Sequence, residues 1–172
     1  KLIDSTADVS LNFMNIASAT GSTGGLLFDD SGSSSTPGGG LTIANTAFSG
    51  SEPGWVGVKV TTINDTSFTL SNNVLTGSTG ADQGGIDFTV DGGGTATPNA
   101  SLTLDGNSII LSGATPLAVS LTATAGGTIS PLGGTGNLAI DGTDPLTGTT
   151  LFDANGTDAN ISGSLEINGN LV

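Results

Sequence analysis

Short runs in which apolar and polar residues alternate recur along the whole chain. One run, apolar–polar–apolar followed closely by Asn or Gly, has six copies: Leu11-Asn12-Phe13, Leu41-Thr42-Ile43, Phe68-Thr69-Leu70, Leu102-Thr103-Leu104, Leu138-Ala139-Ile140 and Leu165-Glu166-Ile167. Their first residues are 30, 27, 34, 36 and 27 positions apart. Because alternate side chains of a strand point to opposite faces, each copy predicts a short strand with one buried face.

A second apolar pattern lies between these copies. Its members are Leu26-Leu27-Phe28, Val56-Gly57-Val58, Ile86-Asp87-Phe88, Leu117-Ala118-Val119 and Leu151-Phe152, which begin 15, 15, 18, 15 and 13 residues after the first pattern. A weaker third set contains Ile63, Ile129 and Ile161. Strands this short cannot bury enough surface alone, whereas copies stacked on one another form a continuous core.

The two patterns therefore predict an all-β fold, a parallel β-helix (β-solenoid) of about five to six coils. Residues 1–172 then form a single repeat-built β domain. We expect Ile43, Leu70, Leu104 and Ile140 to stack in one inward row. The alternative is an antiparallel β-sandwich or jelly roll, because strands separated by regular turn residues are also typical of that fold.

Gly, Pro and Asn residues gather between the predicted strands, where they are expected to form the corners of the coil. Asn occurs at the fifth or sixth position of most first-pattern copies, as in Asn45, Asn72, Asn73 and Asn107. Stacked asparagines can satisfy the backbone groups of their neighbours. We therefore predict a buried amide ladder at one corner.

Two short motifs resemble the repeats of known surface proteins. Gly24-Gly25-Leu26-Leu27 and, less closely, Gly84-Gly85-Ile86-Asp87 resemble a GG-apolar-apolar signature, and Phe68-Thr69-Leu70-Ser71-Asn72 is similar to an F-x-x-N signature but one residue longer. These signatures occur in polymorphic outer-membrane proteins, and the order of the repeats resembles the parallel β-helix passengers of bacterial autotransporters. The resemblance implies surface display and adhesion, and it implies no catalytic residues.

The charge balance excludes two classes of partner. The chain has two basic residues, Lys1 and Lys59, against 15 acidic residues, and its net charge is −13. Nucleic-acid binding requires many basic groups to displace counterions, so no nucleic-acid partner is expected. An anionic membrane surface would repel the chain, and no apolar run of about 18 residues could insert into a membrane. This acidic composition favours a secreted, extracellular or cell-surface protein.

Catalytic constellations are scarce in the sequence. There is no His, Cys or Arg, so a serine nucleophile would lack its usual base. Asp29-Asp30 is the one adjacent acidic pair, and neighbouring strand residues face opposite sides. We therefore expect no enzyme activity. A glycan-active enzyme that uses two carboxylates is the remote alternative.

Calcium is the ion that this composition can bind, because it prefers hard oxygen ligands. The candidate ligands are Asp141 and Asp144 in one segment and Asp153 and Asp158 in the next. Ordinary turn chemistry of Asp and Asn is the alternative for these residues. No other cofactor is expected.

Two further features bear on ligands. Thr42, Thr69 and Thr103 could form an outward threonine ladder of the kind that ice-binding solenoids use. The repeat alignment interrupts that row with Asn12, Ala139 and Glu166 and shows no second threonine column, which disfavours ice binding. Trp55 is expected to be a core residue at the edge of a coil, with an exposed glycan-stacking role as the alternative.

Both ends of the chain have strand-like apolar residues without a polar cap. Open sheet edges readily pair with other strands. We therefore expect a structural or adhesive surface protein whose partners are other copies of itself, adjoining repeats, or host or cell-surface glycans. The alternative is a self-assembling subunit of a pilus-like extracellular filament, joined by strand exchange at its termini.

Overall fold

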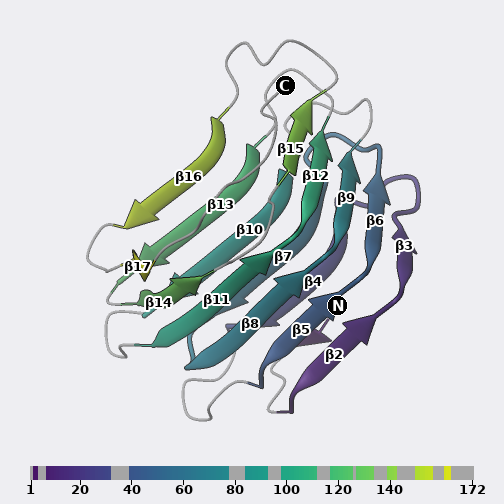
Figure 1. The fold of residues 1–172 in the computed structure, drawn as a ribbon. Helices are drawn as coiled ribbons and strands as arrows, with labels where there is room; N and C mark the ends of the chain where they lie inside the picture. The colour runs from purple at the N-terminus through teal and green to yellow at the C-terminus, as the bar shows by residue number, and fades with distance from the viewer. Residues whose placement is uncertain are drawn as a thin grey trace.

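Three parallel β-sheets make up the described part of the chain (Figure 1). The structure is a computed structural model, and it describes residues 2–3, 7–31, 39–77, 84–92, 98–111, 117–125, 127–133, 139–142, 150–156 and 161–163. Sheet A has six strands in the order β1 (Leu2–Ile3), β4 (Gly24–Asp30), β7 (Val56–Thr62), β10 (Gly84–Asp91), β13 (Leu117–Thr124) and β16 (Thr150–Gly156). Sheet B has six, in the order β2 (Val9–Asn12), β5 (Leu41–Ala44), β8 (Thr66–Ser71), β11 (Asn99–Asp105), β14 (Thr128–Gly133) and β17 (Ile161–Gly163). Sheet C has five, in the order β3 (Asn15–Ala17), β6 (Ala47–Gly50), β9 (Val74–Gly77), β12 (Ser108–Leu111) and β15 (Ala139–Gly142).

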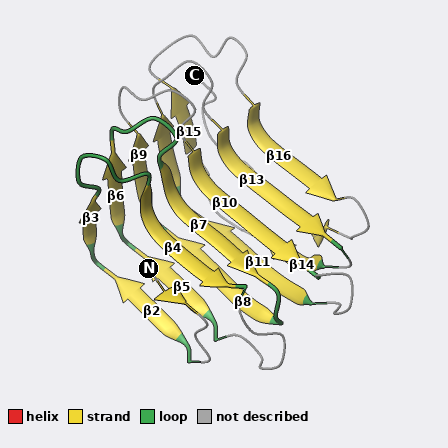
Figure 2. Ribbon diagram, turned by 180° about the vertical axis from the view of Figure 1, so that it is seen from behind, coloured by secondary structure: helices red, strands yellow, loops and turns green. Residues whose placement is uncertain are grey.

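The chain visits the three sheets in a fixed order. It passes from sheet B to sheet C to sheet A and then returns to sheet B one strand further along, as in β5, β6, β7 and β8. Every strand pairing in the described residues is parallel. Sheet B faces the viewer in Figure 1 and sheet A does so in Figure 2. The prediction of stacked parallel strands is confirmed, and the antiparallel sandwich is wrong because every pairing between the described strands is parallel.

The interior row of sheet B agrees with the sequence pattern over three strands. Ile43 pairs with Leu70, and Leu70 pairs with Leu104. All three side chains are almost fully buried. The fourth predicted member is wrong, because Ile140 belongs to β15 of sheet C and is the register partner of Ile109.

The first copy of the pattern is also shifted. Leu11 pairs with Ile43 rather than with Leu41, whose partner is Val9. Sheet A shows a similar shift, since Leu26 pairs with Val58 and not with Val56. A two-residue shift keeps the apolar side chains on the same face, so the sequence pattern alone cannot detect it.

Glycines allow sheet C to pack closely against sheet A. A Cβ atom at Gly57 would lie 2.5 Å from Cδ2 of Leu75 and 2.9 Å from the carbonyl oxygen of Gly85. At Gly25 it would lie 2.9 Å from Cδ1 of Phe48. Gly25 and Gly57 therefore lie in strands of sheet A and provide space for side chains of sheet C, rather than forming corners.

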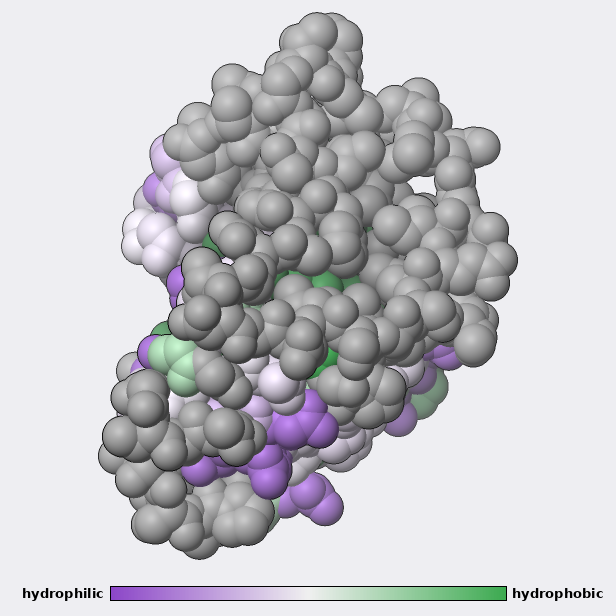
Figure 3. Space-filling view, turned by 90° about the vertical axis from the view of Figure 1, so that its left-hand side faces the viewer, coloured by the Kyte–Doolittle hydropathy of each residue, from purple (hydrophilic) through white to green (hydrophobic). Residues whose placement is uncertain are grey.

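Aromatic rings fill the space between sheets A and B. The ring of Phe68 packs edge-to-face between Phe28 and Phe88, with centroid distances of 5.2 and 4.9 Å. Trp55 is fully buried and donates a hydrogen bond from Nε1 to Oγ of Ser18, 2.8 Å away. This confirms the predicted core role of Trp55. On the side shown in Figure 3, the described surface is mostly hydrophilic to intermediate, in keeping with an apolar interior.

A two-residue corner joins each of the strands β2, β5, β8 and β11 of sheet B to the next strand of sheet C. Its first residue has a positive φ in four successive repeats: Phe13 (54°), Asn45 (51°), Asn72 (53°) and Gly106 (63°). The second residue is Asn73 or Asn107 in two of them, and both side chains are buried. Nδ2 of Asn73 donates to Oδ1 of Asn107, 2.9 Å away. The predicted buried amide ladder is therefore confirmed for Asn73 and Asn107, whereas Asn45 and Asn72 are exposed.

Within the described residues, no helix is long and apolar enough to cross a membrane.

Candidate functional site

A row of hydroxyl side chains runs across the outer face of sheet B. Ser10 pairs with Thr42, Thr42 with Thr69, and Thr69 with Thr103. Each lies between two inward-facing residues of its strand, so its side chain points away from the core. The register across β2, β5, β8 and β11 contains no shift. The four residues therefore form one continuous row.

A second hydroxyl column lies beside this row. Ser67 pairs with Ser101, and each lies two residues before a threonine of the row, on the same face of the sheet. We call the six residues Ser10, Thr42, Ser67, Thr69, Ser101 and Thr103 the hydroxyl face. Three of them are exposed and three are partly exposed. The face is therefore open to a ligand along its whole length.

The hydroxyl face differs from the row that the sequence predicts. Asn12 does not interrupt it, because Asn12 pairs with Ala44 and Ser10 takes the place beside Thr42. Ala139 does not interrupt it either, because that residue lies in sheet C. Glu166 lies outside the described residues. The row ends at β14, where the partner of Thr103 is Gly133 and the register shifts.

No member of the hydroxyl face is ionisable near neutral pH, although the whole chain has a net charge of −13. Three acids flank the face, each two residues from one of its members: Asp8, Asp65 and Asp105. Asp8 accepts a hydrogen bond from the backbone N–H of Gly40, Asp65 accepts one from the backbone N–H of Asn99, and Asp105 is the register partner of Ser71. The centre of this surface is thus neutral on a strongly acidic protein.

Sheet A also carries a threonine row on its outer face, but in a charged setting. Thr61, Thr89 and Thr122 are register partners across three strands. Lys59 and Asp87 lie two residues before Thr61 and Thr89 on the same face and are also register partners. Nζ of Lys59 lies 3.0 Å from Oδ2 of Asp87. The two sheets therefore present similar rows with different electrostatic surroundings.

The adjacent acids of the sequence face opposite sides of β4. Asp30 is 3% exposed, and its Oδ2 accepts a hydrogen bond from Nδ2 of Asn64 at 2.9 Å. Asp29 lies on the outer face, where the hydroxyl of Ser31 donates to its Oδ1. As predicted, the two carboxylates do not share one site. Asp30 instead stabilises the turn that follows β7.

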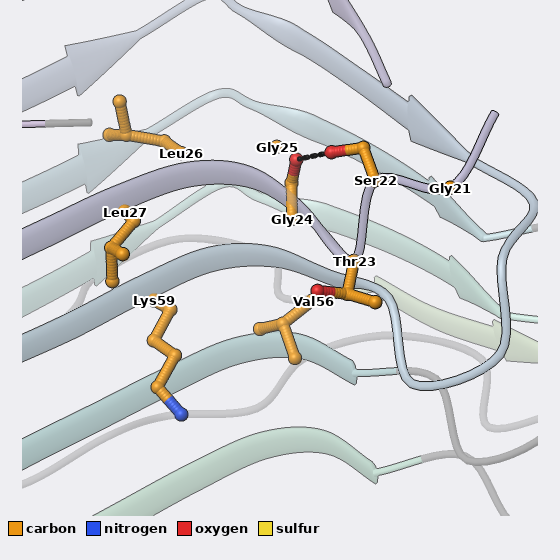
Figure 4. Close-up of a pocket in the computed structure, with 9 residues that line it drawn as sticks. All are labelled: Gly21, Ser22, Thr23, Gly24, Gly25, Leu26, Leu27, Val56 and Lys59. Carbon is orange, nitrogen blue, oxygen red and sulfur yellow. Dashed lines mark hydrogen bonds between the residues drawn. The ribbon is translucent and has the colours of Figure 1, made fainter. Parts of the chain in front are cut away.

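An open hollow of about 550 Å³ lies over the start of β4 (Figure 4). It is lined by residues 21–27, Val56 and Lys59. The hydroxyl of Ser22 donates to the carbonyl oxygen of Gly24 at its rim. Lys59 is the one ionisable side chain among these lining residues, and it is paired with Asp87. The hollow thus brings together no acid–base pair.

The calcium candidates are separated or undescribed. Asp141 lies in β15 of sheet C as the register partner of Ile110, and Asp153 lies in β16 of sheet A as the partner of Ser120. Asp144 and Asp158 lie outside the described residues. The part of the chain that the structure describes contains no group of three or more His, Cys, Asp or Glu residues that could hold a metal ion. Calcium binding therefore stays a prediction.

Comparison of the chain with protein families, with curated proteins and with solved structures finds no match. Its function is therefore inferred from its own residues.

Proposed function

We propose that this protein is a non-catalytic, extracellular structural or adhesive β-solenoid of about five to six coils. The observation that supports this best is the uninterrupted register of β2, β5, β8 and β11, which builds one regular outer face from four repeats. In a solenoid each added repeat lengthens such a face without changing the core. A long, regular and exposed face suits attachment to an extended surface.

The distribution of polar groups supports a binding role over a catalytic one. The adjacent acids Asp29 and Asp30 point to opposite sides of their strand, and Asp30 accepts a hydrogen bond from Asn64. Lys59, beside the hollow, forms a salt bridge with Asp87. An acidic surface with few basic residues fits an extracellular location.

A filament subunit is the second candidate, and one specific feature favours it. β2 and β3 are the outermost strands of sheets B and C. Phe13, between them, is 80% exposed, and Met14 is 43% exposed. An outermost strand beside exposed apolar residues can accept a strand from another copy.

Two measurements on the purified chain separate these candidates. The adhesive role predicts a monomer in size-exclusion chromatography, and beads coated with the protein should resist detachment by flow from ice, glass or polysaccharide. The filament role predicts polymers in electron micrographs, which Phe13→Asn should shorten or abolish because Asn tolerates the same positive φ. A monomer whose beads detach as easily as albumin-coated beads would contradict both.

A further inference from the structure

We infer that the hydroxyl face adsorbs to the surface of ice crystals. This inference names the substrate of the proposed adhesive role and rests on that role. It follows from the spacing, the chemistry and the charge of six side chains.

The hydroxyl groups form a two-dimensional grid. Neighbouring parallel strands lie about 4.8 Å apart, and alternate residues of one strand about 6.6 Å apart. Thr69 and Thr103 are separated by the spacing between strands, and Ser67 and Thr69 by the spacing along one strand. Water oxygens at an ice surface also lie on a regular grid with repeats of similar length. Because the register is uninterrupted from β2 to β11, the row of Ser10, Thr42, Thr69 and Thr103 stays periodic over four strands, and Ser67 and Ser101 add the second direction on β8 and β11.

The side chains suit ordered water. A hydroxyl group donates one hydrogen bond and accepts two, as a lattice of water molecules requires. The methyl group of threonine adds a small apolar surface beside each hydroxyl, at Thr42, Thr69 and Thr103. Side chains of this size leave the face without long, mobile groups that would have to be ordered on binding.

The charge pattern also favours ice. A charged group holds its own hydration shell, and removing that shell is costly. The hydroxyl face is neutral on a chain of net charge −13, which matches a neutral lattice. Asp8, Asp65 and Asp105 lie at the margins of the face, and the negative charge of the chain opposes association between copies in solution.

Other occupants fit the face less well. Polysaccharide chains are commonly held by aromatic rings stacked on the sugars, and the hydroxyl face contains no aromatic residue. The one tryptophan, Trp55, is fully buried. A protein partner would be expected to bury a larger apolar patch. An ice surface requires neither feature.

The test compares two matched variants. Thr69→Asp and Thr89→Asp each place a carboxylate at a partly exposed, outward position of a central strand. Thr69 belongs to the hydroxyl face, whereas Thr89 belongs to the threonine row of sheet A, beside Lys59 and Asp87. Each protein is frozen slowly around a cold probe, and its concentration is measured in the ice and in the remaining liquid.

The wild-type protein and Thr89→Asp should concentrate in the ice. Thr69→Asp should lower the ice-to-liquid ratio roughly tenfold, which corresponds to about 1.4 kcal/mol. Circular dichroism should show that both variants are folded. If Thr69→Asp does not fold, Thr42→Asp places the same charge at a more exposed position of the same row.

Exclusion of the wild-type protein from ice, as seen for albumin, would overturn the inference. Equal losses in the Thr69 and Thr89 variants would overturn it as well, because the hydroxyl face would then not be the binding surface. Retention on cellulose or chitin without enrichment in ice would overturn ice as the substrate and leave the proposed adhesive role standing.

Discussion

Asn73 and Asn107 are joined by a buried hydrogen bond of 2.9 Å between Nδ2 of the first and Oδ1 of the second. Each also donates to a backbone carbonyl of the preceding repeat, Asn73 to Ile43 and Asn107 to Leu70. Oδ1 of Asn107 accepts a further hydrogen bond from the backbone N–H of Asn73. The corner between sheets B and C therefore links one repeat to the next through side chains as well as through strand pairing.

Replacing Asn107 with Ala should destabilise the protein. The change removes the acceptor of the Asn73 backbone N–H and of one of the two hydrogen bonds from Asn73 Nδ2, together with the donor to the Leu70 carbonyl, and the loss of such buried partners costs about 1–3 kcal/mol. Urea unfolding followed by the fluorescence of Trp55 measures this loss. Asn45→Gly is the control, because Asn45 is exposed and glycine adopts its positive φ easily. Its effect should stay within about 0.5 kcal/mol, and an equal loss in both variants would rule out a special role for the ladder.

Leu104→Asp should unfold the protein or lower its stability by more than about 4 kcal/mol. Leu104 is 2% exposed and continues the interior row of Ile43 and Leu70, so the variant buries an unpaired charge. The neighbouring change Thr103→Asp places the same charge on the outer face and should be tolerated. Thermal melting of the two variants measures the difference. Similar melting temperatures would show that the inward and outward faces of β11 are assigned wrongly.

Gly57→Ala should be destabilising although alanine is a modest change. The new methyl group would meet Leu75 and the backbone of Gly85, and overpacking of this kind costs about 1–3 kcal/mol. Gly24→Ala has only ordinary contacts, with the nearest atom at 3.8 Å, and should be neutral or slightly stabilising. Urea midpoints of both variants provide the measurement. A neutral Gly57→Ala would mean that sheets A and C are further apart at this point.

Calcium binding at the segments that contain Asp141, Asp144, Asp153 and Asp158 would stabilise the folded state, since a ligand bound only to the folded protein raises its melting temperature. EDTA should then lower the melting temperature of the purified protein, and an excess of calcium should restore it. Magnesium at the same concentration is the control, because it prefers a smaller and stricter coordination shell. An unchanged melting temperature in all three conditions would rule out calcium binding at these segments.

The periodicity of the sequence was sufficient to predict the parallel stacking and much of the core. Ile43, Leu70 and Leu104 share an apolar–polar–apolar pattern because two inward residues of each sheet B strand face the core. The asparagine ladder was predictable for a related reason, since Asn73 and Asn107 recur at the same distance from that pattern.

Sheet C could not be predicted in the same way. Its strands are three or four residues long, and β6 and β9 each bury one large apolar side chain, Phe48 and Leu75, whereas β12 buries Ile109 and Leu111. A single buried residue in a strand gives no alternation, so residues 138–140 matched the first pattern, whose other described copies lie mainly in sheet B. That assignment in turn placed Ala139 in the threonine row. The continuous hydroxyl face became visible only from the register of the strands.

Disulfide trapping tests the parallel, in-register stacking of the repeats most directly, because the chain has no cysteine of its own. Thr69→Cys/Thr103→Cys joins two register partners of sheet B, whose expected separation of about 4.8 Å lies within the Cα range of a disulfide. Thr69→Cys/Thr89→Cys is the control, with its cysteines on the outer faces of different sheets. Mild oxidation followed by intact-mass analysis and peptide mapping should detect an intramolecular disulfide in the first variant and none in the second. Failure of the first variant to form the bond, or equal formation in both, would contradict the stacked parallel fold on which the hydroxyl face depends.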